Sequence, residues 1–300
     1  MFSEKSRKAK IQHLFYRTLT NYIMSNSTFS YASLTDPNKP QVMGILNVTP
    51  DSFYDGGQYT NDENIIAKVR QFVDEQVDII DIGGMSSRPG AEIIPEKTEL
   101  ERVVSAIQLV RQLTTIPISI DTLRVKVAEK AILHGANMIN DISGGQFDKD
   151  MFSFVATAKV PYCLMHMRAT PQDMQAHTHY QNIVEDIYRY FVSNIEKLQK
   201  MGFEDVVIDL GFGFSKTLDQ NYQLLSSLTQ FSKLGKAMLV GVSRKSMIYK
   251  YLNISSKEAL NGSTVLHTFA LMHGANILRV HDVKEAVQAV KIFQKINDNH

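Results

Sequence analysis

The chain has 300 residues, 44% of them hydrophobic, which suffices for one large α/β domain because barrels of that class have roughly 250 residues. Its 32 basic and 31 acidic residues give a formal charge of +1, which excludes a global field that would attract nucleic acid or an anionic membrane. No apolar stretch approaches the ~20 residues that span a bilayer, and a single cysteine, Cys163, excludes an intramolecular disulfide.

Residues 1–40 differ in composition from the rest of the chain. They are rich in Lys, Arg, Ser, Thr and Asn, and their only acidic residues are Glu4 and Asp36. This composition is typical of an organellar transit peptide, although a solvated arm or a linker from a longer polypeptide explains it equally well. We expect an N-terminal extension over residues 1–40 and a cytoplasmic protein, with the mitochondrial matrix as the alternative compartment.

From residue 41 onward, short β-rich runs alternate eight times with longer amphipathic runs. In residues 96–113 apolar side chains recur at three- and four-residue spacing, which predicts a helix with one buried stripe. Gly-Ala-Asn occurs at residues 135–137 and 274–276, where each glycine is expected to end a helix before the next strand. The predicted strands are residues 41–46, 77–82, 116–121, 136–141, 160–166, 204–210, 236–242 and 276–280.

Alternation of strands and helices implies parallel strands with right-handed crossovers. The pattern predicts a (β/α)8 TIM barrel that forms one catalytic domain over residues 41–300, with an open doubly wound sheet as the alternative. Polar residues after nearly every strand favour the closed barrel, because the C-terminal ends of its strands carry the chemistry. Cys163 lies in the apolar run VPYCLMH, which predicts an inert buried thiol.

The first strand ends in the string NVTPDSF. Asn47 follows the strand directly, and a turn that caps the next helix would explain the residues after it. The functional alternative is an oxygen ligand for Mg2+, which prefers amide and carboxylate oxygens together with phosphate and water.

Acidic and amide residues end three of the other predicted strands. Asp121, Asn140 and Asp209 could each cap a helix, but at the tops of barrel strands their side chains should converge on the mouth. Such a group suits a flat heterocycle with several N–H donors, such as a pterin. Arg88, in the loop after the second strand, could clamp a carboxylate or phosphate, or could simply be exposed.

Basic residues follow the last two strands, where barrels of this class usually hold phosphate. Lys245 lies in SRKS, and Arg279 and His281 lie in RVHD, which together predict a diphosphate site. The segment DLGFGFSKT lacks the spacing of a phosphate loop, so its glycines more plausibly permit close approach of a ligand ring with Phe212 or Phe214 packed on it. Among the histidines His166 is a second, weaker candidate, and the chain contains no HExxH zinc motif.

These motifs, in their order along the chain, resemble the dihydropteroate synthase family over about residues 41–295. The strings DISGGQFDKDMF and FSKTLDQN are closer to fungal and plant members than to most bacterial ones. The resemblance implies a transferase of folate biosynthesis that condenses 6-hydroxymethyl-7,8-dihydropterin diphosphate with 4-aminobenzoate, uses Mg2+ and releases diphosphate. It also suggests a homodimer that binds small molecules and neither nucleic acid nor membrane.

The resemblance assigns roles to individual positions. Lys245, Arg279, His281 and Asp121 would be catalytic. The pterin would contact Asp121, Asn140, Asp209 and Lys245, and the diphosphate would contact Asn47, Arg279 and His281, with Asn47 also reaching the metal. The 4-aminobenzoate side would consist of Ser87, Arg88, Pro89, Phe214 and Ser246.

Three positions depart from the family pattern. Met85 replaces a polar residue, Ser87 replaces threonine and Leu210 replaces proline. Two rival functions remain: a pterin-binding methyltransferase domain, which needs no diphosphate site, and a catalytically silent subunit of another folate enzyme.

Overall fold

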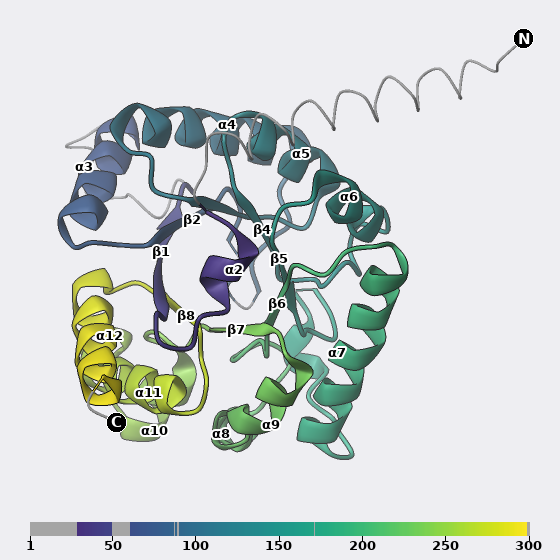
Figure 1. The fold of residues 1–300 in the computed structure, drawn as a ribbon, viewed down its shortest axis with the longest axis vertical. Helices are drawn as coiled ribbons and strands as arrows, with labels where there is room; N and C mark the ends of the chain where they lie inside the picture. The colour runs from purple at the N-terminus through teal and green to yellow at the C-terminus, as the bar shows by residue number, and fades with distance from the viewer. Residues whose placement is uncertain (1–28, 50–60, 87, 89, 171, 299–300) are drawn as a thin grey trace, which may run out of the picture.

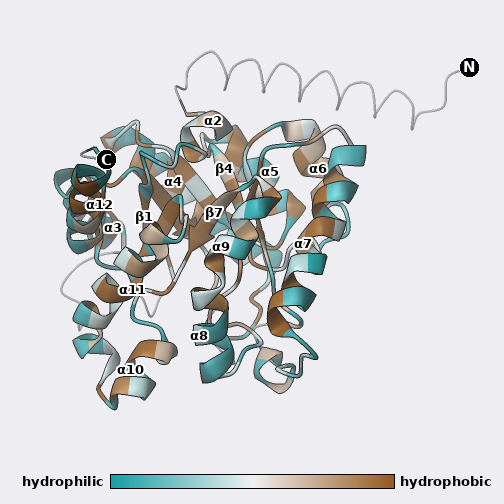
Figure 2. Ribbon diagram, turned by 60° about the horizontal axis from the view of Figure 1, so that its bottom comes forward, coloured by the Kyte–Doolittle hydropathy of each residue, from teal (hydrophilic) through white to brown (hydrophobic). Residues whose placement is uncertain are grey.

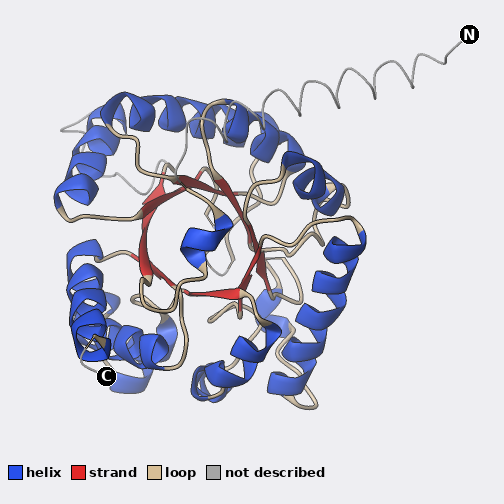
Figure 3. Ribbon diagram, in the orientation of Figure 1, coloured by secondary structure: helices blue, strands red, loops and turns tan. Residues whose placement is uncertain are grey.

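The computed structural model describes residues 29–49, 61–86, 88, 90–170 and 172–298. Eight parallel strands pair in chain order, and β1 pairs with β8 as well as β2, so the sheet closes into a barrel (Figure 3). The strands are β1 (Gln41–Asn47), β2 (Ile79–Gly83), β3 (Ile118–Asp121), β4 (Met138–Asp141), β5 (Tyr162–Met165), β6 (Val206–Asp209), β7 (Ala237–Val240) and β8 (Ile277–Val280). The expected (β/α)8 barrel is confirmed, and each predicted strand is present with its ends shifted by at most two residues.

Helices surround the barrel and connect successive strands (Figure 1). The helix predicted over residues 96–113 is confirmed as α4, and Val103, Ile107 and Val110 of its stripe are fully buried. The outer helices are α3 (Asn61–Asp74), α4 (Glu96–Leu113), α5 (Val125–Leu133), α6 (Met151–Ala158), α7 (Ile183–Lys200), α8 (Leu218–Ser226), α9 (Leu228–Phe231), α10 (Ser246–Leu252), α11 (Leu260–Met272) and α12 (Val283–Asn297). Three short 3-10 helices join them: η2 (Met174–Ala176), η3 (Ser232–Leu234) and η4 (Ser256–Glu258).

Glycine ends two of these helices as predicted. Gly135 follows α5 with φ +110°, and Gly274 follows α11 with φ +94°. Other residues rarely adopt this left-handed conformation, so glycine lets the chain reverse directly into β4 and β8.

A short helix, α2 (Tyr31–Leu34), covers the N-terminal end of the barrel, here called the bottom (Figures 1 and 2). Leu34 is buried against apolar side chains that fill the lower barrel interior. The Tyr31 hydroxyl donates to Val206 O at 2.7 Å and accepts from Ala237 N at 3.2 Å, which links the starts of β6 and β7. Part of the expected N-terminal extension is therefore packed on the barrel, and residues 1–28 lie outside the described residues.

The lower interior is apolar throughout. Its buried members are Leu34, Met43, Ile79, Met138, Cys163, Val207, Ala237, Leu239 and Ile277. Cys163 is a free thiol with no exposed area, and burial raises its pKa well above the ordinary value, as expected for an inert thiol. Among the described residues, none of the helices combines the length and the apolar character that a bilayer span requires.

Candidate active site

One layer of polar side chains lies above the apolar bottom of the barrel. Side chains alternate along a strand, and four members of this layer follow inward-facing apolar residues of the bottom cluster by two positions. The layer consists of Asp81 of β2, Asp121 of β3, Asn140 of β4, Asp209 of β6 and Arg279 of β8. The structure thus places Asp121, Asn140, Asp209 and Arg279 at the strand ends, as their sequence positions predict.

Arg279 links two carboxylates of this layer. Its Nε lies 2.7 Å from Asp81 Oδ2 and its Nη2 lies 2.8 Å from Asp121 Oδ2. Burial lowers the pKa of Arg279, but the two carboxylates outweigh that effect and hold the pKa above its ordinary value. Asp81 was missed as a candidate, although its place in DIGG, two residues after the inward-facing Ile79, was a usable signal.

Two buried oxygens in the layer accept no hydrogen bond from the described residues: Asp81 Oδ1 and Asn140 Oδ1. Asn140 uses its amide nitrogen to donate to Asp81 Oδ2 at 3.1 Å. Buried polar atoms are nearly always paired, and leaving one unpaired costs about 1 to 3 kcal/mol. The layer therefore offers acceptors to a ligand that carries N–H donors.

Burial raises the pKa of both Asp121 and Asp209. For Asp121 the neighbouring Arg279 opposes the rise, while Asp81 and Glu99 add to it. For Asp209 the Lys245 side chain opposes it, and Asp209 Oδ1 accepts from Gly211 N at 2.8 Å. The pKa of both carboxyl groups is therefore raised by burial, and the neighbouring cations reduce the size of that shift.

Lys245 precedes α10 and extends toward the loop that follows β6. Its Nζ donates to Phe212 O and lies 4.8 Å from the centre of the Phe214 ring. Burial lowers its pKa to about 8, against the influence of Asp209. A Cβ on Gly241 would lie 3.9 Å from Lys245 Nζ and 3.8 Å from Arg279 Cβ, so this glycine lies between the two cations.

A buried ion pair supports Asp121 from outside the mouth. Arg124 Nη1 contacts Glu99 Oε2, and Thr122 Oγ1 donates to Glu99 Oε1 at 2.5 Å. Arg124 Nη2 also donates to Ile94 O at 2.7 Å. The pair therefore fastens the loop between β2 and α4 to the end of β3.

His281 and Arg88 are exposed at the mouth. Partial burial of the ring and then the charges of Arg279, Arg244 and Arg88 lower the pKa of His281 to about 4, although nearby Asp282 opposes this shift. Arg244 is turned away from the polar layer, because its Nε and Nη2 each lie 2.8 Å from Asp282 carboxylate oxygens. Of the two basic residues between β7 and α10, Lys245 thus extends toward the polar layer and Arg244 does not.

Asn47 ends β1 beside this layer. A Cβ on Gly83 would lie 3.0 Å from Asn47 Oδ1 and 3.7 Å from Asp121 Oδ2, so glycine leaves space between an amide oxygen and a carboxylate. Such oxygens fit Mg2+, which commonly takes one or two protein ligands and completes its shell with phosphate and water. Among the described residues there is no cluster of three or more His, Cys, Asp or Glu side chains able to hold a metal on their own.

An apolar wall lies beside the polar layer. Phe214 packs against it, and Met85 belongs to it with 8% of its surface exposed. Met85 therefore faces this wall rather than solvent, and Leu210 is fully buried in the outer core. Ser246 begins α10 directly after Lys245, whereas Ser87 and Pro89 lie outside the described residues. The buried members of the wall are Met85, Leu123, Ile142, Met165, Met167 and Met174.

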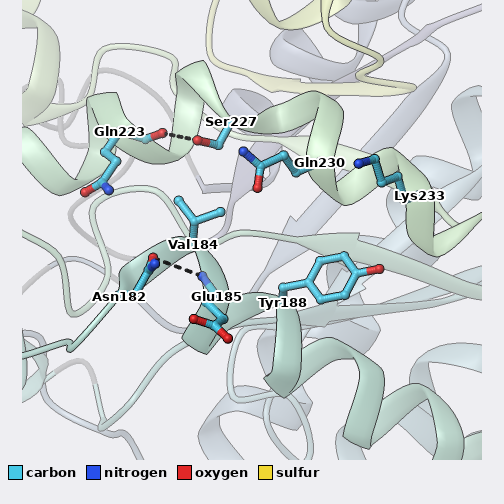
Figure 4. A pocket seen from close by; sticks show the side chains of 8 residues that line it. All are labelled: Asn182, Val184, Glu185, Tyr188, Gln223, Ser227, Gln230 and Lys233. Atoms are coloured by element: carbon cyan, nitrogen blue, oxygen red, sulfur yellow. Dashed lines mark hydrogen bonds between the residues drawn. The ribbon is translucent and has the colours of Figure 1, made fainter.

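A separate pocket of about 550 Å³ lies on the outside of the molecule, where α7 approaches α8 and α9 (Figure 4). Asn182 Oδ1 accepts from Glu185 N at 3.3 Å, and Ser227 Oγ donates to Gln223 O at 2.8 Å. None of the candidate site residues lines this pocket. Its lining residues are Asn182, Val184, Glu185, Tyr188, Gln223, Ser227, Gln230 and Lys233.

Comparison with known proteins agrees with this geometry. The family model described as pterin binding enzyme matches residues 43–281. A dihydropteroate synthase of Synechocystis is 43% identical over 84% of this chain and 88% of its own length. A folic acid synthesis protein of Schizosaccharomyces pombe is 41% identical over 86% of this chain and 36% of its own length. Bacterial and fungal relatives thus match equally well, and the expected nearness to fungal and plant members stays a prediction.

A solved structure supports the same assignment at the level of the fold. The dihydropteroate synthase of Xanthomonas albilineans with 4-aminobenzoic acid is 38% identical, has a TM-score of 0.81, and the match covers 87% of this chain and 94% of that one. The chain belongs to the dihydropteroate synthase family of pterin-binding enzymes.

Proposed function

We propose that the barrel mouth joins 6-hydroxymethyl-7,8-dihydropterin diphosphate to 4-aminobenzoate, which makes the chain a transferase of folate biosynthesis. The observation that carries the proposal is the polar layer, in which acidic and amide acceptors lie next to Arg279 and Lys245. A pterin needs the acceptors, and a diphosphate needs the cations.

The pterin ring occupies the polar layer. Asp121, Asn140 and Asp209 accept its N–H groups, and the free oxygen of Asn140 is one such acceptor. Lys245 lies at the side of Asp209 and holds the ring from above. Family membership supports these roles, because each residue stands in a motif that the resemblance rests on.

The diphosphate lies at the mouth, where Arg279, His281 and Asn47 surround it. In the reaction the bond between the pterin methylene carbon and the diphosphate oxygen breaks, and both electrons leave with diphosphate. The guanidinium of Arg279 neutralises part of that charge without rearranging, because Asp81 already fixes it. The amine nitrogen of 4-aminobenzoate then bonds to the methylene carbon, and its proton passes to the departing diphosphate or to solvent.

Magnesium fits the space beside Asn47 and supplies further positive charge to the diphosphate when bound. The oxygen of Asn47 and the carboxylate of Asp121 would face it across Gly83.

The 4-aminobenzoate side of the mouth is formed by Phe214, Ser246 and the loop with Ser87, Arg88 and Pro89. Phe214 supplies an apolar face next to the methionine-rich wall. Arg88 is exposed and lies within electrostatic reach of His281, so it can meet the substrate carboxylate at the entrance.

Two copies of the chain form a dimer through α10 and α11. Leu252, Val265 and Met272 on these helices are 50%, 57% and 70% exposed, which is unusual for large apolar side chains. A Cβ on Gly262 would lie 3.6 Å from Leu252, so the two helices form one continuous face.

The compartment proposed is the cytoplasm.

The test is turnover of the purified chain with the pterin diphosphate, 4-aminobenzoate and Mg2+, followed by mass spectrometry of dihydropteroate. We expect product only when both substrates are present. The variant Asp209→Asn should weaken pterin diphosphate binding about 10- to 100-fold, since a hydrogen bond to a charged group contributes about 1.5 to 3 kcal/mol. Asp205→Asn, at the opposite end of β6, is the matched control. Saturable pterin binding without product would contradict the proposal and indicate a silent subunit.

A further inference from the structure

Lys216 is a buried lysine in the loop between β6 and α8, and the reaction outlined above gives it no role. Only 3% of its surface is exposed. Its Nζ lies 2.9 Å from Gly211 O, 2.8 Å from Phe214 O and 3.3 Å from His166 O, and 3.2 Å from His166 Nδ1. The three carbonyl oxygens can all accept a hydrogen bond only if Lys216 has three N–H donors. Lysine has three such donors only in its charged ammonium form.

Charged groups on the elements that face Lys216 influence its pKa. Burial lowers the pKa of Lys216 well below its ordinary value, Asp209 on β6 opposes this, and Lys245 and Arg168 add to it. Burial and the nearby Lys216 and Arg168 also lower the pKa of His166, so its ring is neutral and can accept a hydrogen bond. Burying a cation among neutral partners costs free energy. The contacts of that cation hold the loop in one conformation.

All four successive carbonyl oxygens of residues 211–214 accept a side-chain donor. Lys216 binds the first and the last of them, Lys245 binds that of Phe212, and Gln175 Nε2 donates to that of Gly213 at 3.2 Å. The segment is therefore held between two lysines, one below it and one at the mouth.

Glycine makes this arrangement possible. Gly211 has φ +69°, and a Cβ there would lie 2.2 Å from His166 O, a distance that real atoms do not reach. The loop can approach β5 closely enough for Lys216 to bridge them only because residue 211 has no side chain.

We infer that Lys216 is a positioning residue that ties residues 211–214 to the end of β5 and thereby fixes Phe214 and Lys245 relative to Asp209. It contacts neither substrate. Its effect reaches the reaction through the Phe212 carbonyl, which holds Lys245, and through Phe214, which forms one side of the mouth. The kinetic consequences of this inference rest on the proposed function. The loop contacts themselves are independent of it.

The first experiment compares Lys216→Met with Lys236→Met in the full chain. Lys236 is a matched control because its Nζ also binds a backbone carbonyl, Glu204 O at 2.9 Å, at the opposite end of β6 and β7. Hydrogen exchange of residues 211–216 should become faster in Lys216→Met and stay unchanged in Lys236→Met. Unchanged exchange in Lys216→Met would overturn the inference, whatever the chain catalyses.

The second experiment measures kinetics on the same variants. We expect kcat of Lys216→Met to fall about 100-fold, as displacement of reacting groups by ~1 Å typically causes. The alkaline limb of the kcat/KM profile should also move upward, since burial is the main cause that lowers the pKa of Lys245 and a loosened loop makes Lys245 less buried. An equal loss in Lys236→Met, or a limb that does not move, would indicate a merely structural role. If the methionine variant does not fold, Lys216→Gln, whose amide keeps two of the three N–H donors, decides the question by the same measurements.

Discussion

Arg279 bridges two buried carboxylates, so its replacement has two separable effects. Loss of its charge at the diphosphate should lower kcat about 10²- to 10³-fold, the usual cost of one preorganised contact. Asp81 and Asp121 would also be left unpaired, which typically destabilises a fold by about 3 to 5 kcal/mol. We therefore expect Arg279→Ala to lose both activity and stability.

Turnover and denaturant unfolding, measured on the same preparations, separate these effects. Arg111→Ala is the control, because Arg111 binds Gly135 O and Ile116 O at the bottom of the barrel. It should lose stability and keep kcat. An Arg279→Ala variant with wild-type kcat would show that the diphosphate binds elsewhere.

Lys245 makes the reaction sensitive to pH in the alkaline range. Its pKa is lowered to about 8, mainly by burial, so the fraction that carries a charge falls as the pH rises through that value. We expect kcat/KM to decline above about pH 8 and the decline to shift upward in Lys245→Arg, whose guanidinium stays charged. The check is a pH profile between 6 and 10, and a flat profile across that range would argue against a charged Lys245 in turnover.

The sequence correctly predicted the site residues whose place near a strand end is enough to determine where their side chains lie. Asp121 and Asp209 end their strands and Asn140 is the last but one residue of β4, so alternation along a parallel barrel places them inward. Asp81 was missed although it follows the inward-facing Ile79 by two positions, and its pairing with Arg279 shows its part in the site. Arg244 and Lys245 are neighbours in sequence, and only tertiary contacts reveal that one binds Asp282 while the other extends toward Phe214.

At the scale of elements, α2 closes the bottom of the barrel without touching the mouth. Leu34 is 1% exposed and fills the lower interior. We expect Leu34→Ala to lower the free energy of unfolding by about 2 to 5 kcal/mol, as for other buried leucines. KM for both substrates should stay unchanged, because the apolar layer separates α2 from the polar layer.

Thermal or denaturant unfolding combined with steady-state kinetics checks this prediction. Ala32→Ser, on the exposed side of the same helix, serves as the control and should leave both quantities unchanged. A raised KM in Leu34→Ala would mean that the bottom of the barrel is coupled to the mouth. Helix α2 could not be predicted from the sequence, since its four residues are too few to show a helical period.

At the scale of the whole molecule, the exposed apolar face of α10 and α11 predicts the oligomeric state. Met272→Lys places a charge on that face, and burying an unpaired charge in an interface is unfavourable. We expect the wild-type chain to sediment as a dimer and Met272→Lys as a monomer at micromolar concentration. Ile292→Lys on α12, which is 64% exposed, is the control. A monomeric wild-type chain would exclude the proposed dimer.

The fold as a whole was predictable because its signal is repeated eight times. Each β-rich run followed by an amphipathic run points to the same architecture, so an error of two residues at one strand end changes nothing. Closure of the barrel was inferred only from polar strand ends, and the pairing of β1 with β8 confirms it.

The position of α2 bears on how the protein can be handled. The end of α12 also lies at the bottom, where Gln294 Nε2 donates to Asn38 O at 3.2 Å (Figure 2). Both ends of the described chain are therefore on the face opposite the substrate entrance. A reporter protein, an affinity tag or a surface tether joined at Phe29 or Asp298 would therefore begin on the far face and leave that entrance free, so the enzyme could be immobilised for ligand screening in a defined orientation.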